Sequence, residues 1–231
     1  MNRPSDLRDF AAWNEAMVAL YDPDAYHTRS PLPVRWIEKL RVRAVVRALG
    51  ATPSMRVLEV GCGAGNVLAR VRAVRVGLDL SPSLLAKARA RLGPAAPLVR
   101  ADAGRLPFAS ASFDRVFCSE VLEHVLHPEQ VIAELRRLLR PGGWAVVSIP
   151  NEPLINWAKK WAFRMPLGRQ ILQGNADGYR VSEKMDDEWH LHEFDPARLE
   201  QAVKGVFAVA RLQGVPTRWF ALRHVALLTP L

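Results

Sequence analysis

The sequence predicts a doubly wound α/β fold, in which helices cover both faces of a mostly parallel sheet. Short apolar runs alternate with segments of helical periodicity from residue 55 to residue 149. Continuous apolar runs of this length are typical of strands that are buried on both faces. The first run ends in the turn Gly61-Cys62-Gly63-Ala64-Gly65. Glycine permits positive φ and a close approach of backbone N–H groups, so this turn predicts a ligand-binding corner.

Each element of this core is assigned from its own run of residues. Strands are expected at 55–60, 74–79, 97–101, 113–118 and 144–149. Helices are expected at 65–72, 82–92 and 128–140. Ser81 is in position to cap the second helix, whose first turn holds Pro82, and Pro141-Gly142-Gly143 ends the third.

Two helices are expected before the core, at 5–20 and at 34–49. Tyr26 and His27 are placed in the loop that joins them, and Gly50 closes the second helix. The second helix has an apolar face that includes Trp36 and a basic face that includes Arg41.

After the core, a helix is expected at 195–204, with Asp195 as its cap. Two last strands, Val206 to Leu212 and Trp219 to Leu228, are expected to form an antiparallel hairpin at the sheet edge. Its turn is placed near Gly214-Val215-Pro216.

Composition limits the classes of protein to which the chain can belong. With 231 residues, of which 49% are apolar, one globular domain with a substantial core is expected. No uncharged apolar run reaches about eighteen residues, so no membrane-spanning helix is expected, and the first residues lack the apolar core of a signal peptide. Cys62 and Cys118 fall at expected buried positions. They predict no disulfide framework and a cytoplasmic location.

The net charge of +9 comes from 32 basic and 23 acidic residues, and most of the basic residues are arginine. An anionic partner, such as nucleic acid or lipid head groups, would explain this charge. A general preference for arginine would explain it equally well. No basic run exceeds three residues, which favours the second explanation.

Two acidic residues follow expected strands in the order that a nucleoside site needs. Asp79 stands eighteen residues after Gly61, where a carboxylate can accept both hydroxyls of a ribose. Asp102 follows the third strand. The third small residue of a dinucleotide fingerprint is replaced by Asn66, and the Gly-Lys-Ser/Thr of a phosphate-binding loop is absent. These departures argue against an oxidoreductase or a nucleoside triphosphatase.

At this point the chain resembles the class I S-adenosylmethionine-dependent methyltransferases, in the type 11 subgroup that includes the ubiquinone and menaquinone methyltransferases. The matching text runs from Val57 to Pro150 as VLEVGCGAGNVL, GLDLSPSLLAKAR, ADAGRLPF, SFDRVFCSEVLEHV and LRPGGWAVVSIPN. The resemblance implies a Rossmann-like, seven-stranded sheet with an antiparallel last strand. It also implies S-adenosyl-L-methionine as the cofactor.

The same resemblance assigns residues to the parts of that cofactor. Asp79 would take the ribose hydroxyls and Leu80 would pack on the adenine. Asp102 and the Ala103 backbone would read the adenine ring, and the Ser119 carbonyl would meet the amino group of the methionine tail. The methionine moiety would lie against Glu59, Gly61, Gly63 and Gly65.

The chain is therefore expected to be one methyltransferase domain over residues 1–231. A helical cap at 1–50 precedes a cofactor-binding core at 51–150, a lid or substrate insertion at 151–193, and a last helix and strand hairpin at 194–231. A basic amphipathic helix at 154–165 carries Trp157 and Trp161 on one face. It is expected either to pack these side chains inward as a lid or to contact a membrane surface.

Methyl transfer to a hydroxyl needs a base, and three histidines near strand ends are candidates: His124, His190 and His192. His127 stands immediately before a helix. His190, His192 and Glu193 lack the further ligands of a characteristic metal spacing, so no metal is expected.

The leading prediction is methyl transfer to an O, N or C atom of a small or lipid-like molecule, by in-line displacement. The alternatives are a non-catalytic module that binds S-adenosylmethionine, and an RNA or protein methyltransferase. Ser119-Glu120-Val121-Leu122 stands where nucleic-acid amino-methylating enzymes carry an Asn/Asp-Pro-Pro-aromatic turn, so no specific nucleic-acid partner is expected. The substrate and the oligomeric state stay open, and peripheral membrane contact would place the protein at the membrane surface.

Overall fold

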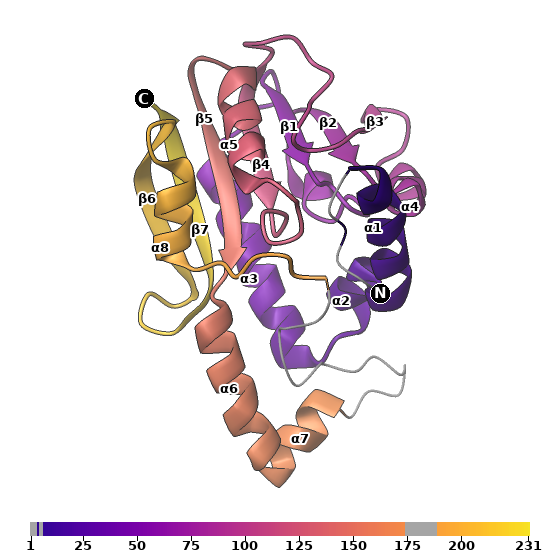
Figure 1. Cartoon of the computed structure of the whole chain (residues 1–231), viewed down its shortest axis with the longest axis vertical. Helices are drawn as coiled ribbons and strands as arrows, with labels where there is room; N and C mark the ends of the chain where they lie inside the picture. Colours follow the sequence, from indigo (N-terminus) through magenta and orange to yellow (C-terminus); the bar gives the residue numbers. More distant parts are fainter. Residues whose placement is uncertain (1–3, 5–6, 174–188) are drawn as a thin grey trace.

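One seven-stranded sheet organises the molecule. The computed structural model describes residue 4 and residues 7–173 and 189–231. The strand order is β3-β2-β1-β4-β5-β7-β6, with β7 antiparallel to both of its neighbours and the first five strands parallel (Figure 1). The strands are β1 Arg56–Val60, β2 Val74–Asp79, β3 Leu98–Arg100, β4 Phe113–Ser119, β5 Leu139–Pro150, β6 Phe207–Pro216 and β7 Ala221–Pro230. The predicted fold class is confirmed.

Helices cover both faces of this sheet, as predicted. On one face, α5 (Pro128–Leu138) and α8 (Pro196–Val203) bury leucine and valine side chains against β1, β4, β5 and β7. On the other face, α3 (Leu32–Leu49) and α4 (Pro82–Leu92) pack with residues of β1, β4 and β5. The carboxyl ends of the parallel strands thus meet at one edge, where ligands bind in such sheets.

Capping residues in the sequence determine where two of the helices begin. Helix α4 spans the predicted residues 82–92, and the Ser81 side chain accepts a hydrogen bond from Leu84 N as its cap. Asp195 caps α8 in the same way, through Arg198 N.

The predicted helix at 65–72 is wrong. That segment holds only a 3-10 turn, Leu68–Arg70, because the chain must leave it at Val71 to reach the start of β2 three residues later. Helix α5 also ends two residues early, and Pro141-Gly142-Gly143 lies inside β5, where Gly142 has a φ of 76°.

The N-terminal region holds three helices where two were predicted: α1 Leu7–Tyr21, α2 Pro23–Arg29 and α3. Tyr26 and His27 lie in α2 and not in a loop. Pro23 pre-sets the helical φ at its first turn after Asp22, whose φ of 35° turns the chain. Helix α1 lies beside α4 and α2 follows it, while α3 runs along one face of the sheet (Figure 1).

Beyond β5, the predicted amphipathic helix is present as α6 (Glu152–Arg164), and α7 (Pro166–Gln173) follows it. The rest of the predicted insertion, 174–188, lies outside the described residues. The predicted hairpin is confirmed, but its turn is at 217–220, because Pro216 still pairs with Ala221. Among the described helices, none is both long and apolar enough to cross a bilayer.

Gly61 and Gly63 offer a matched test of the loop that follows β1. Their φ angles are 69° and 52°, but only a Cβ at Gly61 would clash with another residue, Val121. We expect Gly61→Ala to lower the free energy of unfolding by roughly 2–5 kcal/mol, from backbone strain plus overpacking. Gly63→Ala should cost about 1–2 kcal/mol, from strain alone. Urea denaturation measures both, and equal losses would contradict the clash.

Candidate functional site

A cavity of about 970 Å³ lies at the carboxyl edge of the sheet. Its floor is the loop after β1 and the residues that follow β2, β3 and β4. Helices α1, α2 and α3 form one wall, and α6 with Trp189 and His190 forms another. The site is therefore assembled from segments at both ends of the chain, and the sheet edge brings them together.

The residues predicted to hold the cofactor gather on the floor of this cavity, with one exception. The lining includes Glu59, Gly61, Gly63, Asp79, Leu80, Asp102, Ala103 and Ser119. Gly65 is not among the described lining residues; a Cβ there would meet Leu92 Cδ1 at 2.9 Å, so it serves helix packing.

Asp79 fixes the glycine loop to the end of β2. Its carboxylate accepts hydrogen bonds from Gly63 N at 2.7 Å and from Ser81 N at 2.9 Å. Burial raises the pKa of Asp79, and these backbone donors oppose the rise. Each carboxylate oxygen has a second lone pair, so the side chain keeps acceptor capacity toward the cavity.

Glu59 is buried, and one of its two carboxyl oxygens has no hydrogen-bond partner. The side chain lines the cavity, and its Oε2 atom makes no hydrogen bond. Burial raises the pKa of Glu59 well above its usual range. A buried oxygen without a partner costs free energy, so a cationic or N–H-bearing ligand in the cavity would satisfy it. The open space beside Gly63, where nothing lies within 4 Å of a built Cβ, adds room for such a ligand. These features fit S-adenosylmethionine.

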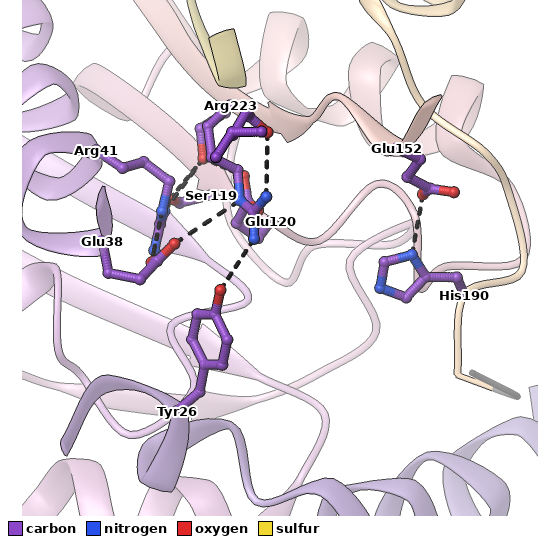
Figure 2. Close-up of polar contacts among 10 residues, drawn as sticks. Tyr26, Glu38, Arg41, Ser119, Glu120, Glu152, His190 and Arg223 are labelled. Carbon is purple, nitrogen blue, oxygen red and sulfur yellow. Dashed lines mark hydrogen bonds and ion pairs between the residues drawn. The ribbon is translucent and has the colours of Figure 1, made fainter. Parts of the chain in front are cut away.

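Sequence reasoning missed a buried ion network that joins α2 and α3 to the strand ends (Figure 2). Arg41, predicted on an exposed face, is 3% exposed and donates to Glu38 at 2.7 and 2.9 Å. It also donates to the hydroxyls of Ser119 and Ser148. Desolvation raises the pKa of Glu38, but Arg41 and Arg223 outweigh it and keep the pKa low. The spacing of Glu38 and Arg41 was the only signal in the sequence.

The second half of this network is Arg223, from β7. Its Nε atom lies 2.7 Å from Glu120 Oε2, and its Nη2 donates to the Tyr26 hydroxyl at 3.1 Å. Burial raises the pKa of Tyr26 to about 12. The network thus joins α2 and α3 to the ends of β4, β5 and β7 by buried contacts.

The three candidate histidines lie in three different environments. His124 lines the cavity and donates Nδ1–H to the Trp189 carbonyl at 3.2 Å; burial and then His190 lower its pKa to about 3. His190 lines the cavity and places Nδ1 2.9 Å from Glu152 Oε1. His192 donates Nε2–H to the Val125 carbonyl at 2.9 Å and is absent from the described lining residues. The structure therefore brings two of the three together.

Helix α6 lines the cavity with a side that does not include its tryptophans. Ile155, Ala158, Lys159 and Ala162 line the cavity. Trp157 and Trp161 point away from it and are 54% and 50% exposed. The expectation that these tryptophans line the substrate cavity is wrong, since the small side chains of α6 pack inward. In the part of the chain that is described, no group of three His, Cys, Asp or Glu residues is placed to hold a metal ion.

Glu123 is a buried carboxyl that the pH dependence of stability can report. It lines the cavity, its Oε2 atom has no partner, and burial, reinforced by Glu120, raises its pKa to about 8. In the unfolded chain it ionises near its usual pKa of 4.5, so its contribution makes stability fall as pH rises from about 4.5 to about 8.

We expect Glu123→Gln to remove this decline. As the pH rises from about 5 to about 8, the free energy of unfolding of the variant should therefore increase relative to that of the wild type. Urea denaturation at both pH values measures the difference. An equal difference at the two pH values would show that the Glu123 carboxyl ionises normally in the folded protein.

Known proteins share the core of this chain. A family model described as a methyltransferase domain matches residues 58–147. A demethylmenaquinone methyltransferase of Beutenbergia cavernae is 34% identical over 164 residues, which cover 66% of this chain and 67% of that protein. A ubiquinone biosynthesis O-methyltransferase of Thiobacillus denitrificans is 34% identical over 157 residues, covering 63% and 64%. Against two other quinone-biosynthesis relatives the chain spans 57% and 48% of their lengths.

Solved structures share the fold at low sequence identity. A methyltransferase of Haloferax volcanii, solved with the Trm112 methyltransferase activator, has a TM-score of 0.65 at 17% identity, covering 100% of this chain and 99% of that one. A protein of Pyrococcus horikoshii has a TM-score of 0.65 at 17% identity, covering 90% and 97%. With the matching family model, the similarity to the Beutenbergia protein and the seven-stranded sheet, the chain belongs to the class I methyltransferases that use S-adenosylmethionine.

Proposed function

We propose that this protein transfers a methyl group from S-adenosylmethionine to a small, lipid-like molecule. One observation carries the proposal: a single cavity is lined both by the predicted cofactor residues and by apolar side chains of α1, α3 and α6. The cofactor supplies a methyl group on a sulfonium, which is a good leaving group. The protein then has to align the two reactants and exclude water.

The floor residues divide the work of holding the cofactor. Asp79 is proposed to accept from the ribose hydroxyls, while its bonds to Gly63 N and Ser81 N keep the loop in place. Glu59 would satisfy its unpartnered oxygen on the cationic tail, near the Ser119 carbonyl. Asp102, Ala103 and Leu80 would contact the adenine. All of these side chains or their backbones border the cavity.

Apolar side chains of α1, α3 and α6 also line the cavity. Phe10, Val18, Ile37, Ile155 and Ala162 line it. Such a lining suits a ring or an isoprenoid chain. Relatives named for ubiquinone and menaquinone biosynthesis act on molecules of this kind, and we propose a hydrophobic, quinone-like precursor as the substrate class.

The outer face of α6 supports contact with a membrane surface. Trp157, Trp161 and Met165 are exposed there, and the exposed cations Lys160 and Arg164 share the face. The hairpin tip adds Trp219, which is 83% exposed, and Phe220. Tryptophan with lysine or arginine on one face is typical of helices that lie in the interface. We propose that the described part of residues 151–193, namely α6 with Trp189 and His190, covers the cavity. We also propose that the protein is cytoplasmic and meets anionic lipid through α6.

The cofactor assignment is tested by Asp79→Asn, which keeps the side-chain volume and removes the charge. We expect the affinity for S-adenosylmethionine to fall by one to two orders of magnitude. This loss corresponds to a charge-assisted pair of hydrogen bonds, which contributes roughly 1.5–3 kcal/mol. Asp114→Asn is the control, because Asp114 is the second residue of β4, at the opposite edge of the sheet, and forms an ion pair with Arg140 at 3.0 Å. Calorimetric titration measures both, and equal affinities would refute the assignment.

The membrane proposal is tested by co-sedimentation with vesicles of phosphatidylglycerol and phosphatidylcholine. Lys160→Glu/Arg164→Glu should weaken binding at least tenfold, since each cation near an anionic surface contributes about 1 kcal/mol. Arg72→Glu/Arg89→Glu changes the net charge equally at exposed positions near the amino edge of the sheet and should bind like the wild type. Added salt should weaken wild-type binding, because exposed charges are screened over about 10 Å at 0.1 M. Equal pelleting of the two variants would exclude a role for α6.

A further inference from the structure

A buried imidazole–carboxylate pair stands beside the cavity on the side of α6. We infer that His190 accepts the proton of a hydroxyl or amine nucleophile, and that Glu152 is the residue that positions it. This inference rests on the proposed methyl transfer and adds to it the group that receives the proton.

The geometry sets the roles of the two side chains (Figure 2). His190 Nδ1 lies 2.9 Å from Glu152 Oε1, and the side chains are 12% and 3% exposed. His190 lines the cavity, while Glu152 is absent from the described lining residues, so the carboxylate stands behind the imidazole. A carboxylate only accepts, so the shared proton is on Nδ1 and the lone pair of the neutral ring is on Nε2.

The position of Glu152 is fixed by the fold. It lies in the first turn of α6, and its backbone N–H donates to the Phe194 carbonyl at 3.5 Å. Phe194 is fully buried in the main core. The carboxylate is therefore held by the junction of β5 with α6, and the imidazole is held by the carboxylate.

The other two candidate histidines lack what a proton acceptor needs. His124 has a pKa near 3, far below the range in which a general base is efficient. His192 uses Nε2–H on the Val125 carbonyl and does not reach the described lining. Each of the two has a carbonyl partner, which orients a neutral ring. His190 alone of the three is paired with a carboxylate, which stabilises a positively charged ring.

Charge conservation favours this arrangement. The substrate oxygen forms a bond to the methyl carbon, its proton moves to His190 Nε2, and the electron pair of the broken C–S bond stays on sulfur. One positive charge therefore disappears at sulfur and one appears on the imidazole. Glu152 provides the opposite charge at the position where the new cation forms, in a site of low polarity.

Two other titratable groups, Glu123 and His124, lie near His190, but neither is a carboxylate in contact with its ring. Glu123 and His124 come from the loop after β4. The His124 ring centroid lies 4.7 Å from that of His190, with the rings edge to face. Burial keeps Glu123 protonated up to about pH 8 and keeps His124 neutral. Among these groups Glu152 is the carboxylate in direct contact with the His190 ring.

The test compares His190→Asn, Glu152→Gln and Glu152→Asp with the wild type and with the control His127→Asn, an exposed residue just before α5. The probe is a prenylated catechol in detergent micelles, and the readouts are methylated product and the pH–rate profile. His190→Asn should lower the rate roughly 10²–10⁴-fold, the usual contribution of a general base. Glu152→Gln should lower it roughly ten- to a hundredfold and move the acidic limb of the profile to lower pH, whereas Glu152→Asp should partly restore it.

Two readouts separate this inference from the proposed function. Calorimetry should give the same affinity for S-adenosylmethionine in all variants. The ¹⁵N shifts of the histidine rings should show His190 protonated at Nδ1 in the wild type, without any substrate. A wild type that binds the cofactor but methylates no catechol would count against the proposed function. A His190 ring protonated at Nε2, or a His190→Asn rate near that of the wild type, would overturn the inference.

Discussion

The buried pairing of two arginines with two glutamates is the interaction on which the cavity depends. Arg41 and Glu38 come from one helix, while Glu120 and Arg223 come from strand ends that are far apart in the chain. Equal numbers of opposite charges leave the network neutral. Removal of one partner would strand a buried charge, at a cost of about 3–5 kcal/mol. The network therefore fixes α3, and with Tyr26 also α2, on the carboxyl edge of the sheet.

The same network explains an unusual backbone position. Glu120 has a φ of 56°, which costs a non-glycine residue roughly 1–3 kcal/mol. Its carboxylate gains the ion pair with Arg223 and accepts a hydrogen bond from Ser148 Oγ at 3.0 Å. The turn after β4 is held in this conformation, and it carries Val121, Glu123 and His124 to the cavity. The ion pair between Glu120 and Arg223 therefore holds one wall of the cavity and also sets the conformation of the turn that contributes to its floor.

The cavity joins two chemical environments that suit two different reactants. Its floor is made of strand ends and a glycine loop, where backbone donors and buried carboxylates meet a charged, polar ligand. Helices α1, α3 and α6 add apolar side chains such as Phe10, Ile37 and Ile155 to the lining. Because α6 turns its small side chains inward, its tryptophans remain on the outside, next to exposed cations. One helix therefore serves both the cavity and an outer surface.

Local signals in the sequence predicted the strands of the parallel core and the capped helices, while the resemblance to a known family predicted the seven-stranded sheet and the cofactor residues. Apolar runs, the Ser81 cap and the glycine turn act within a few residues of themselves. Tertiary structure decided the rest. Arg41 is buried because Glu38 and the hydroxyls of Ser119 and Ser148 accept its hydrogen bonds, and no helical period encodes partners that lie 78 and 107 residues away. The three histidines look alike in the sequence, and only their neighbours, Trp189, Glu152 and Val125, give one of them a carboxylate. Trp157 is exposed because the smaller side chains Ile155, Ala158 and Ala162 are the ones that α6 turns to the cavity, which the amphipathic pattern does not reveal.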